Sequence, residues 1–114
     1  VRTADGGRTW QLVGRAGRDP GPAKTPGVGF SIMPAAVRLA AGEYLLMTRE
    51  WSGPADNRNW VEAWHTADDG RTWAKRADID VANSSTPPSL TRLPGGELVV
   101  TYGRRTPPFG VRAR

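Results

Sequence analysis

The chain has 114 residues, of which 38% are hydrophobic and 24% charged, with 14 Gly, 10 Pro, 5 Trp, one His and no Cys. This length fits one small domain or part of a larger one, and the frequency of glycine and proline excludes a helical bundle. The lack of cysteine excludes disulfides and thiolate metal sites, and because His65 is the single histidine we expect no zinc site. We also expect no cofactor.

The charge is basic, with 16 Lys and Arg against 11 Asp and Glu, a net charge of +5. Arginine binds carboxylates and phosphates bidentately, so one interpretation is an anionic partner. The alternative is a basic composition that serves solubility alone. Nucleic acid is not expected as a partner because the basic residues are scattered. No apolar run approaches the roughly 18 residues that a membrane-spanning helix needs.

Turn residues divide the chain into short segments of strand-like composition. Residues 1–3 and 9–13 form a first pair around an Asp-Gly-Gly turn. Four strands are predicted next, over 34–39, 43–49, 59–66 and 71–77, and then three more over 88–93, 97–103 and 109–114. This succession predicts an all-β fold of antiparallel meanders.

Two segments recur within the chain. Residues 3–10, Thr-Ala-Asp-Gly-Gly-Arg-Thr-Trp, return as 66–73, Thr-Ala-Asp-Asp-Gly-Arg-Thr-Trp, and residues 34–46 return more weakly as 88–100. Repeats with four short strands per unit are typical of β-propeller blades. We therefore interpret residues 1–114 as one partial propeller domain of about two blades. It would comprise the end of one blade (1–13), a complete blade (34–77) and the start of the next (88–114).

The repeated octapeptide has the pattern Thr-x-Asp-x-Gly-x-Thr-Trp. Its Asp is expected to accept hydrogen bonds from backbone N–H groups one to three residues further on, and its Gly to supply a positive φ. The Thr hydroxyls can close the loop, and Trp10 and Trp73 are expected to lie inward and bury a large aromatic surface. The predicted structural residues are Thr3, Asp5, Gly7, Thr9 and Trp10 in the first copy and Thr66, Asp68, Gly70, Thr72 and Trp73 in the second.

The octapeptide resembles the Asp-box, or bacterial neuraminidase repeat, of the sialidase superfamily. Residues 87–113 also resemble the run that precedes an Asp-box in bacterial sialidase-like proteins. The resemblance implies a six-bladed propeller with the boxes between the third and fourth strands of a blade, on the face away from the active site. It therefore implies that Asp5 and Asp68 are structural and not catalytic.

The same resemblance implies a function for the parent protein: an exo-α-sialidase, or a related glycoside hydrolase, that removes terminal sialic acid or another anionic sugar from glycoconjugates. The alternative is a non-catalytic Asp-box propeller that binds a glycan or a protein. Family sialidases use three Arg on the sugar carboxylate, a Tyr nucleophile paired with Glu, and an Asp acid/base. The nucleophile does not map onto Tyr44 or Tyr102, so the catalytic residues stay unassigned. The chain alone is expected to be inactive.

Three further expectations concern the chain as a whole. We expect it to be an excerpt of a longer protein, since it starts without Met and closes within a strand-like alternation. A two-blade piece leaves unpaired faces, so we expect it to be marginally stable alone or to self-associate. The family resemblance implies a secreted or periplasmic location.

Candidate substrate-binding residues come from the loops that would line the ligand face of a propeller, predicted at 14–33, 49–59, 78–87 and 103–109. Arg104, Arg105 and Arg49 are candidate anion ligands, with solvated surface charge as the alternative. Arg112 alternates with small apolar residues and could point to the blade surface or into a pocket.

Two neighbours of Arg49 complete the candidate set. Glu50 could serve acid/base chemistry, or form an ion pair with Arg49 or Arg58. Trp51 and Trp60 could stack on a sugar ring. For Trp60 and Trp64, however, packing in the core between blades is the preferred interpretation.

Overall fold

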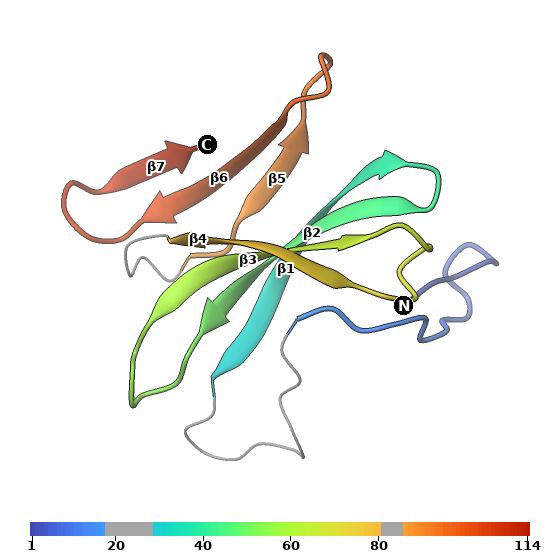
Figure 1. The fold of residues 1–114 in the computed structure, drawn as a ribbon, viewed down its shortest axis with the longest axis horizontal. Coiled ribbons are helices and arrows are strands. Elements are labelled where there is room, and N and C mark those ends of the chain that lie inside the picture. The colour runs from blue at the N-terminus through green and yellow to red at the C-terminus, as the bar shows by residue number, and fades with distance from the viewer. Residues whose placement is uncertain (18–28, 81–85) are drawn as a thin grey trace.

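The computed structural model describes residues 1–17, 29–80 and 86–114, which contain seven strands and no helix (Figure 1). The strands are β1 (Phe30–Ala40), β2 (Glu43–Trp51), β3 (Asn59–Thr66), β4 (Ala74–Asp80), β5 (Ser89–Arg92), β6 (Leu98–Arg104) and β7 (Gly110–Ala113). β1 to β4 form one antiparallel sheet in chain order, and β5 to β7 form a second. The predicted all-β, antiparallel meander is confirmed. Among the described residues, no helix is long and apolar enough to cross a membrane.

Strand pairing gives the first sheet two distinct faces. β2 and β3 pair without interruption from Tyr44↔Thr66 to Trp51↔Asn59, and successive side chains point to opposite sides. Met47, Val61 and their neighbours at odd positions form what we call the core face. The even positions of the two strands form what we call the opposite face.

The core lies between the two sheets. The core face of the first sheet contributes Met47, Val61 and Ala63, and the second sheet contributes Val100 and Tyr102. Val61 is fully buried, and Leu45, Ile79 and Leu90 pack around the cluster. This shared core joins the two sheets through the hydrophobic effect.

Several predicted boundaries are wrong, and local features explain why. β3 matches the prediction, but β1 begins at Phe30, inside the predicted loop 14–33. The early part of β1 pairs with the end of β2, and a register shift follows at Met33, whose φ is 53°. Pro34 after this shift hides the alternation of the first part. β4 begins at Ala74, because residues 71–73 still belong to the turn.

Residues 1–13 form less regular structure than predicted. In place of two strands, a single isolated antiparallel bridge joins Arg2 and Gln11 through two hydrogen bonds of 2.8 Å. Trp10 is 62% exposed, so the prediction that it lies inward is wrong. A two-stranded ribbon alone offers no layer against which the ring can pack.

Candidate functional site

The two octapeptides fold into the same hydrogen-bonded turn. In the copy between β3 and β4, Thr66 Oγ1 donates to Asp68 Oδ1 (2.7 Å) and accepts from Gly70 N (3.0 Å), while Thr72 donates to Asp68 through N (2.9 Å) and Oγ1 (2.6 Å). The indole of Trp73 donates to Gly70 O (3.0 Å). The Asp reaches the fourth residue along the chain, one further than predicted.

The first copy repeats these contacts with residues 3–10. Thr9 donates to Asp5 through N (2.9 Å) and Oγ1 (2.6 Å), and the Trp10 indole donates to Gly7 O (3.1 Å). The predicted positive φ is present at Gly7 (93°) and Gly70 (83°). Two distant segments therefore reach one geometry from one sequence pattern, which shows that the turn is determined locally.

These contacts stabilise ionised carboxylates. The hydroxyl of Thr72, its backbone N–H and the hydroxyl of Thr66 lower the pKa of Asp68 from its usual value near 3.8 to about 2. The equivalent donors, led by the Thr9 hydroxyl, lower the pKa of Asp5 further still. Such groups are poor general acids near neutral pH.

Acid is therefore expected to destabilise the turn. Because the pKa of Asp68 is lower in the folded chain than in the unfolded chain, the unfolded state binds more protons between about pH 4 and pH 2. The stabilisation is complete above pH 4 and is lost as the pH falls through 2. We expect Asp68→Asn to flatten this part of the stability–pH curve, measured by urea unfolding. An unchanged slope would contradict the hydrogen-bond geometry.

The second octapeptide turn and the β2–β3 loop lie at opposite ends of the first sheet. β3 begins at Asn59, next to the β2–β3 loop, and ends at Thr66, where the octapeptide begins. Figure 1 shows the β2–β3 and β6–β7 loops on its left side and the β3–β4 turn on its right. The candidate anion ligands of both sheets therefore lie at the end away from this turn.

A cavity of about 280 Å³ lies at that end. Its lining residues are Phe30, Arg49, Trp51, Asn57 and Asn59. The guanidinium carbon of Arg49 lies 5.2 Å from the Phe30 ring centre, and the rings of Phe30 and Trp51 are also 5.2 Å apart. The Trp51 indole donates to Asn57 Oδ1 (3.0 Å). The cavity thus combines a cation, two aromatic rings and two amides.

Strand register brings these residues together. Trp51 is the partner of Phe30 in β1 and of Asn59 in β3, so residues of three neighbouring strands meet at the cavity. Arg49 precedes Trp51 by two positions and therefore shares the core face of β2. Asn57 enters from the β2–β3 loop, where it has a φ of 49°.

The pKa of the Arg49 side chain is shifted in this cavity. Partial burial lowers the pKa of Arg49, and the positive charge of Arg105 lowers it further. Arg105 follows β6 and does not line the cavity.

The other candidates are placed differently. Arg104 lies in β6 instead of the predicted loop, and its Nη2 donates to Pro107 O (3.0 Å). Its Nε is buried and lacks a hydrogen-bond partner within the described ranges. Arg112 pairs with Tyr102 in the register of β6 and β7 and is exposed.

Arg49, Glu50 and Trp51 all belong to β2, although the predicted loop began at residue 49. Glu50 is fully buried, and its Oε1 accepts hydrogen bonds of 2.6 Å from Ser31 and Thr48 on the opposite face. Alternation along the strand thus separates Glu50 from the cavity of Arg49 and Trp51.

The two tryptophans predicted between blades are also on the opposite face. Trp60 and Trp64 therefore lie on the side of the first sheet that faces away from the second sheet. Trp60 is buried, its indole donates to Glu62 Oε1 (3.1 Å), and the Arg58 guanidinium lies 5.2 Å from its ring centre.

Some of the expected loop residues lie outside the described residues, namely 18–28 and 81–85. Within the described ranges, no group of three or more His, Asp or Glu residues could hold a metal ion.

Comparisons with protein-family models, curated proteins and solved structures each found no match to this chain. The functional interpretation therefore depends on the octapeptide resemblance and on the geometry of the site.

Sequence reasoning missed three lining residues, Phe30, Asn57 and Asn59. Phe30 was hidden because the predicted first strand began at Pro34. The Asn57-Arg58-Asn59 run did carry a signal, since Asn adopts positive φ more readily than most residues and its amide suits polar recognition.

Proposed function

We propose that this chain is part of a sialidase-like β-propeller and that its Arg49 cavity binds the carboxylate of a terminal anionic sugar such as sialic acid. The parent would be an exo-sialidase or a related glycoside hydrolase. One observation carries this proposal: a partly buried guanidinium lines a cavity whose walls include two aromatic rings.

The lining residues of the cavity can contact the carboxylate, the C–H groups and the polar substituents of such a sugar. The Arg49 guanidinium, whose Nη1 also contacts Met33 Sδ (3.7 Å), can form a charge-assisted hydrogen bond to a carboxylate. The rings of Phe30 and Trp51 offer apolar surface to the C–H groups of the sugar ring. The amides of Asn57 and Asn59 can donate to or accept from hydroxyl and acetamido groups.

The fold supports the propeller part of the proposal. The octapeptide at residues 66–73 joins the third and fourth strands of a four-stranded antiparallel meander. The family resemblance assigns the Asp-box to this position. The weakly repeated segment 88–100 begins the second sheet, which packs on the core face of the first.

A second candidate function is glycan binding without hydrolysis. The positions of the two tyrosines favour it: Tyr102 is buried in the core, and Tyr44 lies on the opposite face of the sheet from Arg49. Neither lines the Arg49 cavity, so a Tyr nucleophile for this site would have to come from residues beyond these 114.

Arg49→Ala tests the proposal. Titration with N-acetylneuraminic acid, followed by NMR of the Trp51 indole, is expected to give at least about tenfold weaker binding for this variant, since a hydrogen bond to a charged group contributes about 1.5 to 3 kcal/mol. Arg38→Ala, an exposed arginine of β1, is the matched control and should bind as wild type. Equal affinity for wild type and Arg49→Ala would overturn the assignment.

A turnover assay separates the two candidate functions. Release of a fluorogenic aglycone from a sialoside by the parent protein would favour the hydrolase. Binding without release would favour the glycan-binding module.

A further inference from the structure

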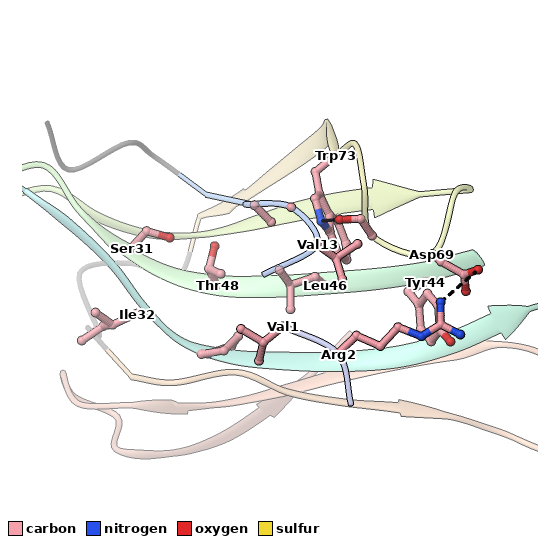
Figure 2. A pocket seen from close by; sticks show the side chains of 14 residues that line it. Val1, Arg2, Val13, Ser31, Ile32, Tyr44, Leu46, Thr48, Asp69 and Trp73 are labelled. Atoms are coloured by element: carbon pink, nitrogen blue, oxygen red, sulfur yellow. Dashed lines mark hydrogen bonds and ion pairs between the residues drawn. The ribbon is translucent and has the colours of Figure 1, made fainter. Parts of the chain in front are cut away.

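A second and larger cavity lies on the opposite face of the first sheet, between that sheet and residues 1–17. It has a volume of about 570 Å³, within the range of roughly 300 to 1,000 Å³ that is usual for small-molecule sites. Figure 2 shows Ser31 and Thr48 toward one end, Tyr44 and Asp69 toward the other, and Leu46 between them. Because it faces away from the Arg49 cavity, it is a separate site.

The hydroxyls at one end have a defined hydrogen-bonding role. Ser31 Oγ and Thr48 Oγ1 each donate their single proton to Glu50 Oε1, at 2.6 Å. A hydroxyl that has donated its proton can still accept a hydrogen bond through its lone pairs. A ligand group that contacts these oxygens must therefore be a donor.

Aliphatic side chains and two aromatic residues make up most of the remaining walls. The Trp73 indole N–H is engaged by Gly70 O (3.0 Å), so the ring can offer a ligand only its apolar surface. The Tyr44 ring also borders the cavity. At the rim, Arg2 and Asp69 form an ion pair of 3.8 Å and cancel one another's charge. Aromatic surface beside hydrogen-bond acceptors suits a ring that carries hydroxyl groups.

We infer that this cavity is a binding site for a neutral sugar residue. The hydroxyls of a pyranose donate to Ser31 and Thr48, and its C–H face packs on Trp73 and Tyr44. The inference does not depend on the proposed function of the Arg49 cavity, because it uses different residues, the other face of the sheet and a ligand without charge.

The test is a titration of the 114-residue chain with methyl α-glucopyranoside, methyl α-mannopyranoside and methyl β-galactopyranoside, followed through the indole N–H resonances. At least one glycoside is expected to shift Trp73 in a saturable way and to leave Trp51 unchanged. The absence of a saturable Trp73 shift with all three would overturn the inference. A shift of Trp73 by choline and by none of the sugars would also overturn it.

Two variants locate the site. Leu46→Phe fills the middle of the cavity and is expected to abolish the Trp73 shift. Thr48→Val removes one acceptor, and we expect about tenfold weaker binding. Leu98→Phe in β6, which does not line the cavity, is the matched control for the added ring. Arg49→Ala should bind the glycoside as wild type does. Retention of the Trp73 shift in folded Leu46→Phe would overturn the assignment, and if Leu46→Phe and Thr48→Val fail to fold, the wild-type titration still decides.

Discussion

Tyr102→Ala is expected to lower the free energy of unfolding by about 3 to 5 kcal/mol, the usual range for removing a large buried aromatic side chain. Tyr102 is 7% exposed and belongs to the cluster that holds Met47, Val61 and Val100. The loss includes the transfer of the ring to water and the cavity left between the sheets. Urea unfolding measures the change directly.

Val111→Ala is the matched control for that substitution. Val111 lies in β7, the strand paired with β6, but it is 77% exposed. Its truncation should change stability by no more than about 0.5 kcal/mol. A loss below about 1 kcal/mol for Tyr102→Ala would mean that the two sheets do not share a packed core.

Lys75→Met is expected to destabilise the protein by about 1 to 3 kcal/mol, because it leaves a buried carboxylate without its cation. Glu62 is 2% exposed, and its Oε1 accepts from Lys75 Nζ (2.8 Å) and from the Trp60 indole (3.1 Å). We place the loss below that of a fully buried pair because the Lys75 side chain is 43% exposed and water can partly replace it.

A double variant separates charge from packing. Adding Glu62→Gln to Lys75→Met replaces the carboxylate with a neutral amide and should recover part of the lost stability. Arg8→Met, an exposed cation in the first octapeptide turn, serves as the control for loss of positive charge. If Lys75→Met unfolds at the same urea concentration as Arg8→Met, the Glu62 carboxylate does not depend on Lys75.

The sequence predicted correctly those parts of the fold that depend on contacts between residues close together in the chain. The Asp, Gly and Thr of the octapeptide build their turn from contacts within seven residues of chain, so both copies could be interpreted from the pattern alone. The strand 59–66 was also predicted correctly, since it lies between a Gly/Pro/Asn loop and an Asp-Gly turn.

The parts that depend on pairing with a distant strand were not predictable in the same way. β1 continues back to Phe30 because Ser31 and Ile32 pair with the end of β2, a partnership that Pro34 conceals. Trp10 fits the pattern as well as Trp73 does, yet it is exposed because residues 1–13 join no sheet among the described residues.

The candidate site also combines features that the sequence predicted with features that depend on strand pairing. The arginine composition and the position of Arg49 beside Trp51 pointed to an anion site near that end of the sheet. The sequence did not reveal that alternation turns Glu50 to the opposite face, or that Phe30 and Asn59 meet Trp51 at the cavity. Both depend on register and on how the sheets pack.

The measurement that tests the central claim most directly compares N-acetylneuraminic acid with its neutral methyl ester as ligands of the 114-residue chain. The two differ in the charge of one group, so the ratio of their affinities reports recognition of the carboxylate by the Arg49 cavity. We expect the acid to bind at least about tenfold more tightly and to shift the Trp51 indole resonance. Equal affinities, or a Trp51 resonance that neither ligand moves, would contradict the claim.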